Sequence, residues 1–350
     1  MSTLFSSLVR ALRFALSHRH ACSMFSAGTL TITSRPTAKT ARALHSSTTA
    51  AIRTESNNNL ETTAIEEDAT TNLLACPKCY SPLIWNGPAL SLGSASGAVL
   101  QCKACEKGYI CNETHLELTV VSETREYGEQ RPAATQLFRT RLVSYLYERG
   151  WRQAFVLGGF PGPEKEFEMS KEYFEPVLGG NIVDASCGSG MFSRLFAKSG
   201  LFSHVIALDF SANMLKECYQ FVQKEDNFLK EKLTLVRADI AQLPFVSNSI
   251  DAVHAGAALH CWPSLSVAVA EISRVLRPGG VFVATTFIAD GPFSTLPIVK
   301  DIRKRIGQVY IFNIFLSEGE FEELFVACGL VGFTCVRNGL FAMLSAAKPR

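Results

Sequence analysis

The chain has 350 residues, of which 47% are hydrophobic and 19% are charged, and its formal net charge is +2. This length suits one large domain with a small one, and this composition is that of an ordinary globular protein. The near-neutral charge argues against a nucleic-acid-binding surface, and the absence of any window of 18 uncharged apolar residues argues against a transmembrane helix.

The first 54 residues differ in composition from the rest of the chain. They are rich in Ser, Thr and Ala and carry six Arg and one Lys, and the first acidic residue is Glu55. We interpret 1–54 as an organelle transit peptide, with a disordered tail as the alternative. A basic amphipathic segment over 8–16 favours a mitochondrion, and the Ser and Thr content favours a plastid, so composition leaves the organelle open. The polar, acidic stretch over 55–72 is predicted to be a linker.

Two Cys-x-x-Cys pairs follow, 22 residues apart. Their members are Cys76, Cys79, Cys102 and Cys105. Two such pairs joined by a hairpin supply four thiolates in tetrahedral geometry, which suits a structural zinc ion. We therefore predict a small zinc-ribbon-like β module over 73–116, with a module of reduced cysteines that has lost its metal as the alternative. Cys111 and His115 lie close by and are not expected to be ligands. Replacing one pair is expected to destabilise the protein without altering a site elsewhere in the chain.

Residues 120–172 are predicted to form a helical bridge. Between 133 and 155 apolar residues recur at helical intervals with arginines between them, and the Gly- and Pro-rich run over 158–163 ends the helix. Three interpretations are open. The bridge is a lid over a ligand site, a contact with a membrane or lipid-droplet surface, or a helix packed on the core.

Strands and helices alternate through the last predicted domain, 173–350. Strands are expected over 182–184, 204–208, 233–237, 250–255 and 280–287, and helices over 191–199, 211–223 and 264–276. This alternation predicts an α/β fold with a parallel doubly wound sheet. Two further strands flank the Asn338-Gly339 dipeptide, which is a strong hairpin signal, so the sheet should end in an antiparallel pair.

The most informative segment is 183–190, VDASCGSG. It joins a strand to a helix through a glycine turn, where α/β folds hold nucleotide-like ligands against backbone N–H groups. The next strand ends in Asp209, about twenty residues after the turn, where such folds place a carboxylate on ribose hydroxyls. With Asp184 in the first segment, Asp239 after the next strand makes three carboxylates at successive strand ends. Each carboxylate taken alone is equally explained as a helix or turn cap.

Four ordered segments, 183–190, 207–215, 237–245 and 274–280, closely resemble the class I S-adenosylmethionine-dependent methyltransferases, and in particular the quinone-biosynthesis branch. The resemblance covers 175–346 and implies a Rossmann-like sheet of seven strands. The whole chain resembles a group of plant plastid methyltransferases without assigned substrates, which are associated with plastoglobules. Its cysteine module is similar to that of bacterial rRNA guanine methyltransferases.

The resemblance implies a set of residues that bind S-adenosylmethionine: Asp184, Ser186, Gly188, Gly190, Asp209, Phe210, Met214, Asp239 and Ile240. Within this set Asp209 would take both ribose hydroxyls, and Asp239 would accept from the adenine amino group. Ser186 departs from the pattern, because the family usually has glycine there. His260 follows the fourth strand of the domain at the substrate edge, and it is either a general base or a structural histidine.

The leading hypothesis is therefore an organellar methyltransferase that acts on a small, apolar acceptor such as a prenylquinol or another isoprenoid. The chloroplast, with its plastoglobules, is the expected location, and the mitochondrion is the alternative. An RNA methyltransferase and a non-catalytic cofactor-binding scaffold on a lipid surface are the competing functions. The sequence leaves the acceptor atom and the oligomeric state open.

Overall fold

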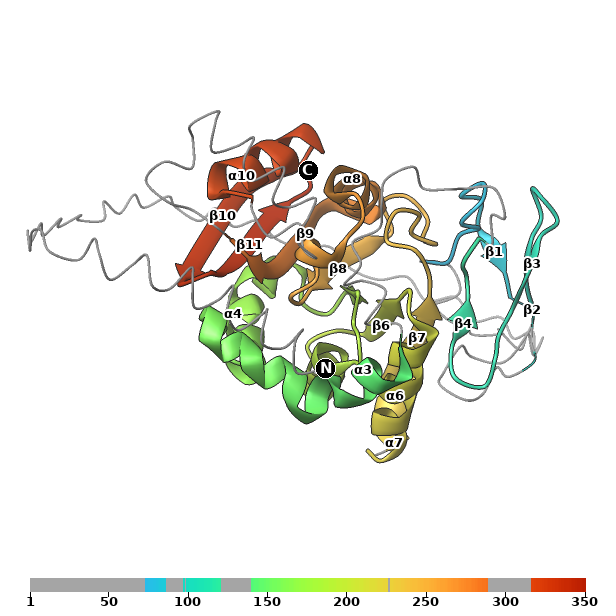
Figure 1. Ribbon diagram of the computed structural model, residues 1–350. Coiled ribbons are helices and arrows are strands. Elements are labelled where there is room, and N and C mark those ends of the chain that lie inside the picture. The colour runs from blue at the N-terminus through green and yellow to red at the C-terminus, as the bar shows by residue number, and fades with distance from the viewer. Residues whose placement is uncertain (1–72, 86–96, 98, 121–139, 226, 289–315) are drawn as a thin grey trace, which may run out of the picture. The chain divides into compact units, whose positions relative to one another are not determined.

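The computed structural model describes residues 73–85, 97, 99–120, 140–225, 227–288 and 316–350 (Figure 1). The predicted transit peptide and linker lie outside these described residues, and so does the first part of the predicted bridge. Among the described helices, none combines the length and the apolar character needed to cross a bilayer.

One sheet positions most of the functional residues, with strand order β10-β11-β9-β8-β5-β6-β7-β4. The strands are β4 (Leu116–Glu117), β5 (Asn181–Ala185), β6 (His204–Asp209), β7 (Leu233–Arg237), β8 (Ile250–Ala255), β9 (Leu276–Phe287), β10 (Val331–Asn338) and β11 (Phe341–Ala347). Strands β4 to β9 pair in parallel, whereas β11 pairs antiparallel with both β9 and β10. The predicted Rossmann-like sheet with its C-terminal antiparallel pair is confirmed.

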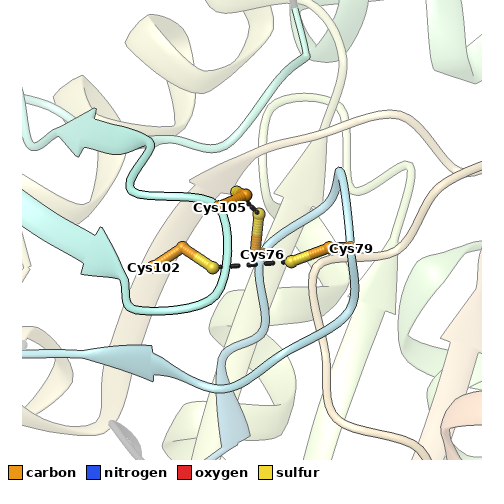
Figure 2. A group of neighbouring side chains, drawn as sticks. All are labelled: Cys76, Cys79, Cys102 and Cys105. Carbon is orange, nitrogen blue, oxygen red and sulfur yellow. Dashed lines mark hydrogen bonds between the residues drawn. The ribbon is translucent and has the colours of Figure 1, made fainter.

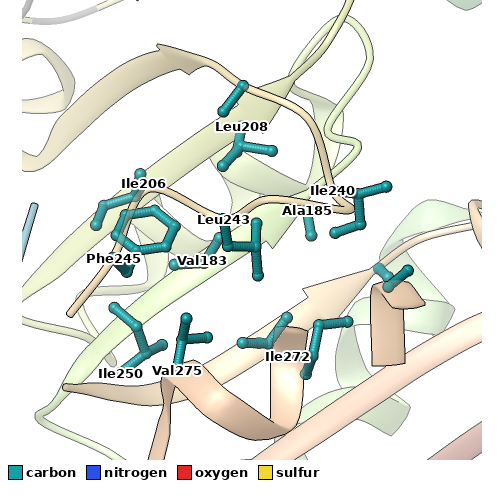
Figure 3. Packing of buried hydrophobic residues seen from close by; sticks show 14 of the residues in the cluster. Val183, Ala185, Ile206, Leu208, Ile240, Leu243, Phe245, Ile250, Ile272 and Val275 are labelled. Carbon is teal, nitrogen blue, oxygen red and sulfur yellow. The ribbon is translucent and has the colours of Figure 1, made fainter. Parts of the chain in front are cut away.

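Helices cover both faces of this sheet. They are α4 (Pro163–Phe174), α5 (Met191–Ser199), α6 (Ala212–Gln223), α7 (Asn227–Lys232), α8 (Leu265–Val275) and α10 (Glu318–Ala327), with short 3-10 turns η4 (Glu175–Val177) and η5 (Leu259–Cys261). Side chains of a strand alternate between faces. Accordingly Ile182 packs in one cluster with Phe196 of α5, whereas Val183 packs in another with Ile272 of α8 (Figure 3).

The predicted bridge is not one continuous helix. The described part consists of α3 (Arg141–Leu146), the π-helical turn η2 (Tyr147–Trp151) and the 3-10 turn η3 (Arg152–Gly158). Gly150 has φ 160° and ψ −30°, outside the helical region, and this breaks the helical hydrogen-bond pattern. The resulting change of direction brings side chains from η2 and η3 to the same pocket, as described below.

The cysteine module contains a small antiparallel sheet of its own, made of β1 (Leu83–Ile84), β2 (Val99–Cys102) and β3 (Gly108–Ile110). One strand differs from expectation. Strand β4 does not stay in this sheet but pairs in parallel with β7, so the main sheet has eight strands where seven were predicted. Without β4, the outer edge of β7 would expose unpaired backbone groups. Strand β4 pairs with this edge, and the Leu118 N–H donates to Arg237 O at 2.9 Å.

The module and the sheet also share a hydrophobic core. Leu74 forms an isolated bridge with Phe245, and both side chains belong to the same buried cluster. The N–H of Ala75 donates to Pro244 O, and the N–H of Val246 donates to Leu73 O, each at 2.9 Å. The segment that follows β7 is therefore held directly by the cysteine module.

Candidate functional site

The three predicted carboxylates lie at the carboxyl ends of neighbouring parallel strands. Asp184 is in β5, Asp209 is the last residue of β6, and Asp239 follows β7 by two residues. Strands β5 to β7 are parallel and in register, so their ends meet at one edge of the sheet. Such an edge is where open α/β sheets bind ligands.

Asp209 organises the glycine turn between β5 and α5. Its Oδ2 accepts a hydrogen bond from the Gly188 N–H at 2.9 Å, and its Oδ1 accepts one from the Ser211 N–H at 2.7 Å. Each carboxylate oxygen has two lone pairs, so each can accept a further hydrogen bond. Gly188 has φ +57°, a left-handed conformation that favours glycine. Asp209 thus fixes the turn, and it also lines the pocket described below.

Asp184 and Gly190 are packed in the core at the glycine turn. The Asp184 carboxylate is 1% exposed and accepts from Ser193 Oγ at 2.5 Å and from His254 Nδ1 at 2.9 Å. At Gly190 a Cβ atom would lie 2.2 Å from Cys218 Sγ. Neither residue lines the pocket described below. In this structure both support the turn from within the core.

Ser186 adopts the conformation that its position in the turn demands. Its φ is +61°, in the left-handed region where glycine is the usual residue. The Ser186 hydroxyl accepts a hydrogen bond from Trp262 Nε1 at 2.9 Å, which links this turn to the loop after β8. The serine therefore retains the turn and adds a link to a second wall of the site.

A pocket of about 980 Å³, counting its open mouth, lies at this edge of the sheet. Its walls contain most of the residues expected from the sequence: Ser186, Gly188, Asp209, Phe210, Met214, Asp239, Ile240 and His260. Oδ1 of Asp239 accepts a hydrogen bond from the Ala241 N–H at 3.0 Å, so this carboxylate also stabilises its own turn. The pocket combines apolar side chains with carboxylate acceptors, as small-molecule sites do.

His260 lies in the pocket wall but is a weak base there. The residue is 2% exposed, and burial together with the positive charge of Arg152 lowers its pKa to about 3. Its Nδ1 lies 3.4 Å from Thr286 Oγ1, and its ring packs edge-on against Phe287. The imidazole is thus neutral at ordinary pH and serves more readily as a hydrogen-bonding group than as a proton acceptor.

Sequence reasoning missed the bridge residues that complete the pocket. Tyr147 of η2 and Phe155 of η3 line it, and so does Trp262 of the loop after β8. The helical periodicity of the bridge gave no sign of which face meets the site, because the break at Gly150 changes that face. Trp262 lies two residues after His260, and that proximity is the signal that marks it.

The four predicted metal ligands come together in the cysteine module (Figure 2). Cys76 Sγ lies 3.6 Å from Cys105 Sγ, and Cys79 Sγ lies 3.5 Å from Cys102 Sγ. All four sulfur atoms lie within 4.8 Å of one another. Neighbouring sulfurs of a tetrahedral zinc site, with Zn–S of about 2.3 Å, are separated by about 3.8 Å. The arrangement has the dimensions of such a site.

Comparison with known proteins gives a consistent result. A family model described as a methyltransferase domain matches residues 183–284. An uncharacterized chloroplastic methyltransferase of Arabidopsis thaliana is 65% identical over 280 residues, which cover 79% of each chain. A second from the same plant is 48% identical over 294 residues, 83% of this chain and 82% of the relative. A demethylmenaquinone methyltransferase of Staphylococcus aureus is 36% identical over 144 residues, 39% of this chain and 56% of that protein.

Proposed function

This chain belongs to the class I S-adenosylmethionine-dependent methyltransferases, and we propose that it methylates a small, lipophilic acceptor such as a prenylquinol or another isoprenoid. The observation that carries the proposal is the convergence of Gly188, Asp209 and Asp239 on one largely apolar pocket. The quinol acceptor is supported by the name of the demethylmenaquinone relative.

The residues of the pocket fit S-adenosylmethionine, which supplies a methyl group on a positively charged sulfur. We assign the ribose hydroxyls to Asp209, whose two oxygens are already oriented by backbone N–H groups and can accept again. Asp239 and the backbone of Ile240 are assigned to the adenine edge, and Phe210 and Met214 to its faces. Ser186 and Gly188 are assigned to the methionine end.

Asp184 and Gly190 are assigned an indirect role. Because both oxygens of Asp184 accept hydrogen bonds from buried protein groups, this carboxylate holds α5 and β8 in place around the turn. Gly190 allows α5 to approach Cys218 of α6. Because neither residue lines the pocket, both are proposed to position the cofactor turn.

The acceptor is assigned to the opposite wall, made by Tyr147, Phe155 and His260. Methyl transfer from a sulfonium needs little more than proximity and exclusion of water. His260 is proposed to orient the acceptor by a hydrogen bond, because its low pKa makes it a poor general base. The bridge then acts as the lid that its position over the pocket suggests.

A structural zinc ion is proposed for the Cys76, Cys79, Cys102 and Cys105 cluster, whose sulfur spacings suit it. We propose a chloroplast location from the names of the two plant relatives. Association with plastoglobules, or another lipid surface, stays a prediction from the resemblance.

One experiment tests the acceptor class. The full chain is incubated with methyl-labelled S-adenosylmethionine and separate plastid lipid and RNA fractions. Label in the quinol or isoprenoid fraction is expected. Label in RNA would favour an RNA methyltransferase, and binding without transfer to either fraction would favour a scaffold. The Asp209→Ala variant is the control that should bind no cofactor.

A further inference from the structure

The bridge meets the glycine turn at Tyr147. The Tyr147 side chain lines the pocket, and a Cβ atom built on Gly188 would lie 3.6 Å from Tyr147 Cε1. The ring therefore lies beside the turn to which the methionine end of the cofactor is assigned. As a member of the acceptor wall, Tyr147 thus also borders the cofactor side of the pocket.

The next residue of the bridge fixes this contact. Glu148 Oε1 accepts a hydrogen bond from Ser189 Oγ at 2.6 Å, and Arg194 Nη2 donates to Glu148 Oε2 at 2.9 Å. Arg194 Nη1 also donates to the carbonyl oxygen of Ser189 at 3.1 Å. The side chains of Glu148 and Arg194 are only 14% and 13% exposed, so solvent screens their ion pair little. Tyr147 and Gly188 are thus held side by side by their neighbours in the chain.

A second aromatic ring borders the same turn. Trp262 lines the pocket, and its Nε1 donates to Ser186 Oγ at 2.9 Å, which holds the edge of the indole against the start of the turn. Trp262 is buried, so this contact is shielded from bulk water. Rings from two distant segments of the chain, the bridge and the loop after β8, therefore border the methionine end of the site.

The chemistry of S-adenosylmethionine puts its positive charge at this point. Its sulfur joins the methionine chain to the ribose and carries the methyl group. With the methionine end on Gly188 and the ribose on Asp209, the sulfur would lie between these two residues, which are themselves joined by a hydrogen bond of 2.9 Å. An aromatic face attracts a cation within about 6 Å of the ring centroid, most strongly where water is excluded.

We infer that the Tyr147 ring contacts the sulfonium of S-adenosylmethionine and that Trp262 supplies a second ring. These rings raise the preference of the site for the charged cofactor over its neutral product, S-adenosylhomocysteine. The inference rests on the proposed function and adds a residue of the bridge to the cofactor site. Because the sulfur of the product carries no charge, its attraction to the rings is lost after methyl transfer, and this favours release of the product.

The charges around Tyr147 agree with this role. Burial raises the pKa of its hydroxyl above the usual value, so the side chain is a neutral phenol and not a general base. Arg152 lies near this hydroxyl and would repel a cation, but its charge is paired with that of Glu166, whose two carboxylate oxygens lie 3.0 Å from Arg152 Nη2. The Asp209 carboxylate also attracts a sulfonium, so the test has to separate its effect from that of the ring.

Calorimetric titration of the full chain with S-adenosylmethionine and with S-adenosylhomocysteine, without an acceptor, measures the preference. Tyr147→Leu should weaken binding of S-adenosylmethionine about 5- to 10-fold more than binding of S-adenosylhomocysteine, because only the first ligand is a sulfonium. Tyr147→Phe keeps the aromatic face and should keep the ratio of the two affinities. Tyr145→Leu removes an exposed tyrosine of the same segment, and as the matched control it should leave the ratio unchanged.

A second measurement separates the charge of the ring face from its size. Pentafluorophenylalanine at position 147 keeps an aromatic ring but removes the negative charge of its face, so the ratio should fall as it does for leucine. This variant also serves if the leucine variant does not fold. An unchanged ratio in either variant would overturn the inference and leave the preference to Asp209. A wild type that binds neither ligand would instead overturn the proposed function.

Discussion

Loss of the proposed zinc ion from the cysteine module should weaken cofactor binding, because the module holds the segment that follows β7 and lines the pocket. The perturbation is Cys76→Ser with Cys79→Ser, or removal of the metal by a chelator. From sequence we expected the pocket to be unaffected. The hydrogen bonds from Ala75 to Pro244 and from Val246 to Leu73 argue for coupling.

The magnitude follows from these contacts. Besides the pairing of β4 with β7, three backbone hydrogen bonds join the module to the β7 region, including that from Leu118 to Arg237. Each contributes about 1 kcal/mol. Arg237 adds an ion pair with Glu117 (2.8 Å) and a hydrogen bond from its Nε to Phe210 O (3.0 Å), next to the pocket. If about half of the free energy of these contacts is lost at the pocket, the affinity for S-adenosylhomocysteine should fall between 10- and 100-fold.

Calorimetric titration with S-adenosylhomocysteine measures the effect. The Cys328→Ser/Cys335→Ser variant is the matched control, because it removes two thiols outside the cluster and should bind normally. Glu117→Gln should produce a smaller loss with the metal retained. Full affinity in a chain shown by metal analysis to be empty would refute the coupling.

Three further predictions concern the pocket. Ser186→Ala should be less stable than Ser186→Gly by about 1 kcal/mol in urea unfolding, because alanine keeps the left-handed φ and both variants lose the bond from Trp262; equal stability would contradict the strain. Asp209→Ala should lose S-adenosylhomocysteine binding in calorimetry, because the turn at Gly188 loses its acceptor, and normal binding would exclude the assigned site. His260 has a folded-state pKa of about 3, below its unfolded value of about 6.5, so its contribution to stability is present above pH 6.5 and is lost as pH falls toward 3. Between pH 6.5 and 4.5 the stability difference between wild type and His260→Asn should therefore shrink by about 2–3 kcal/mol, and a constant difference would contradict the lowered pKa.

The parts of the fold that depend on local sequence pattern could be predicted from the sequence. The apolar runs of β5, β6 and β7 and the glycine turn predicted both the sheet and the edge where Asp209 and Asp239 meet. Strand β4 escaped prediction because two residues give no periodicity, and its partner lies more than 100 residues away. Only the fold brings these segments together.

The same limit applies to the site. The hydrogen bonds from Ser193 and His254 to the Asp184 carboxylate join a helix and a strand to β5, and His254 lies far from Asp184 in sequence. The sequence pattern therefore does not predict them. The pairing of Arg152 with Glu166 crosses the end of one helical segment and the start of the next, so helical periodicity does not predict it. The break at Gly150 decides which bridge residues face the ligand, and an uninterrupted apolar repeat conceals it.

Strand β4 also has a consequence for how the protein can be divided. A fragment that starts at residue 120, after the cysteine module, would leave β7 as an outer strand with its peptide groups open to another molecule. Such a truncation should associate through this strand and precipitate, even with every pocket residue present. We therefore expect the cysteine module to hinder self-association through β7, and an expressed fragment should begin before Leu73.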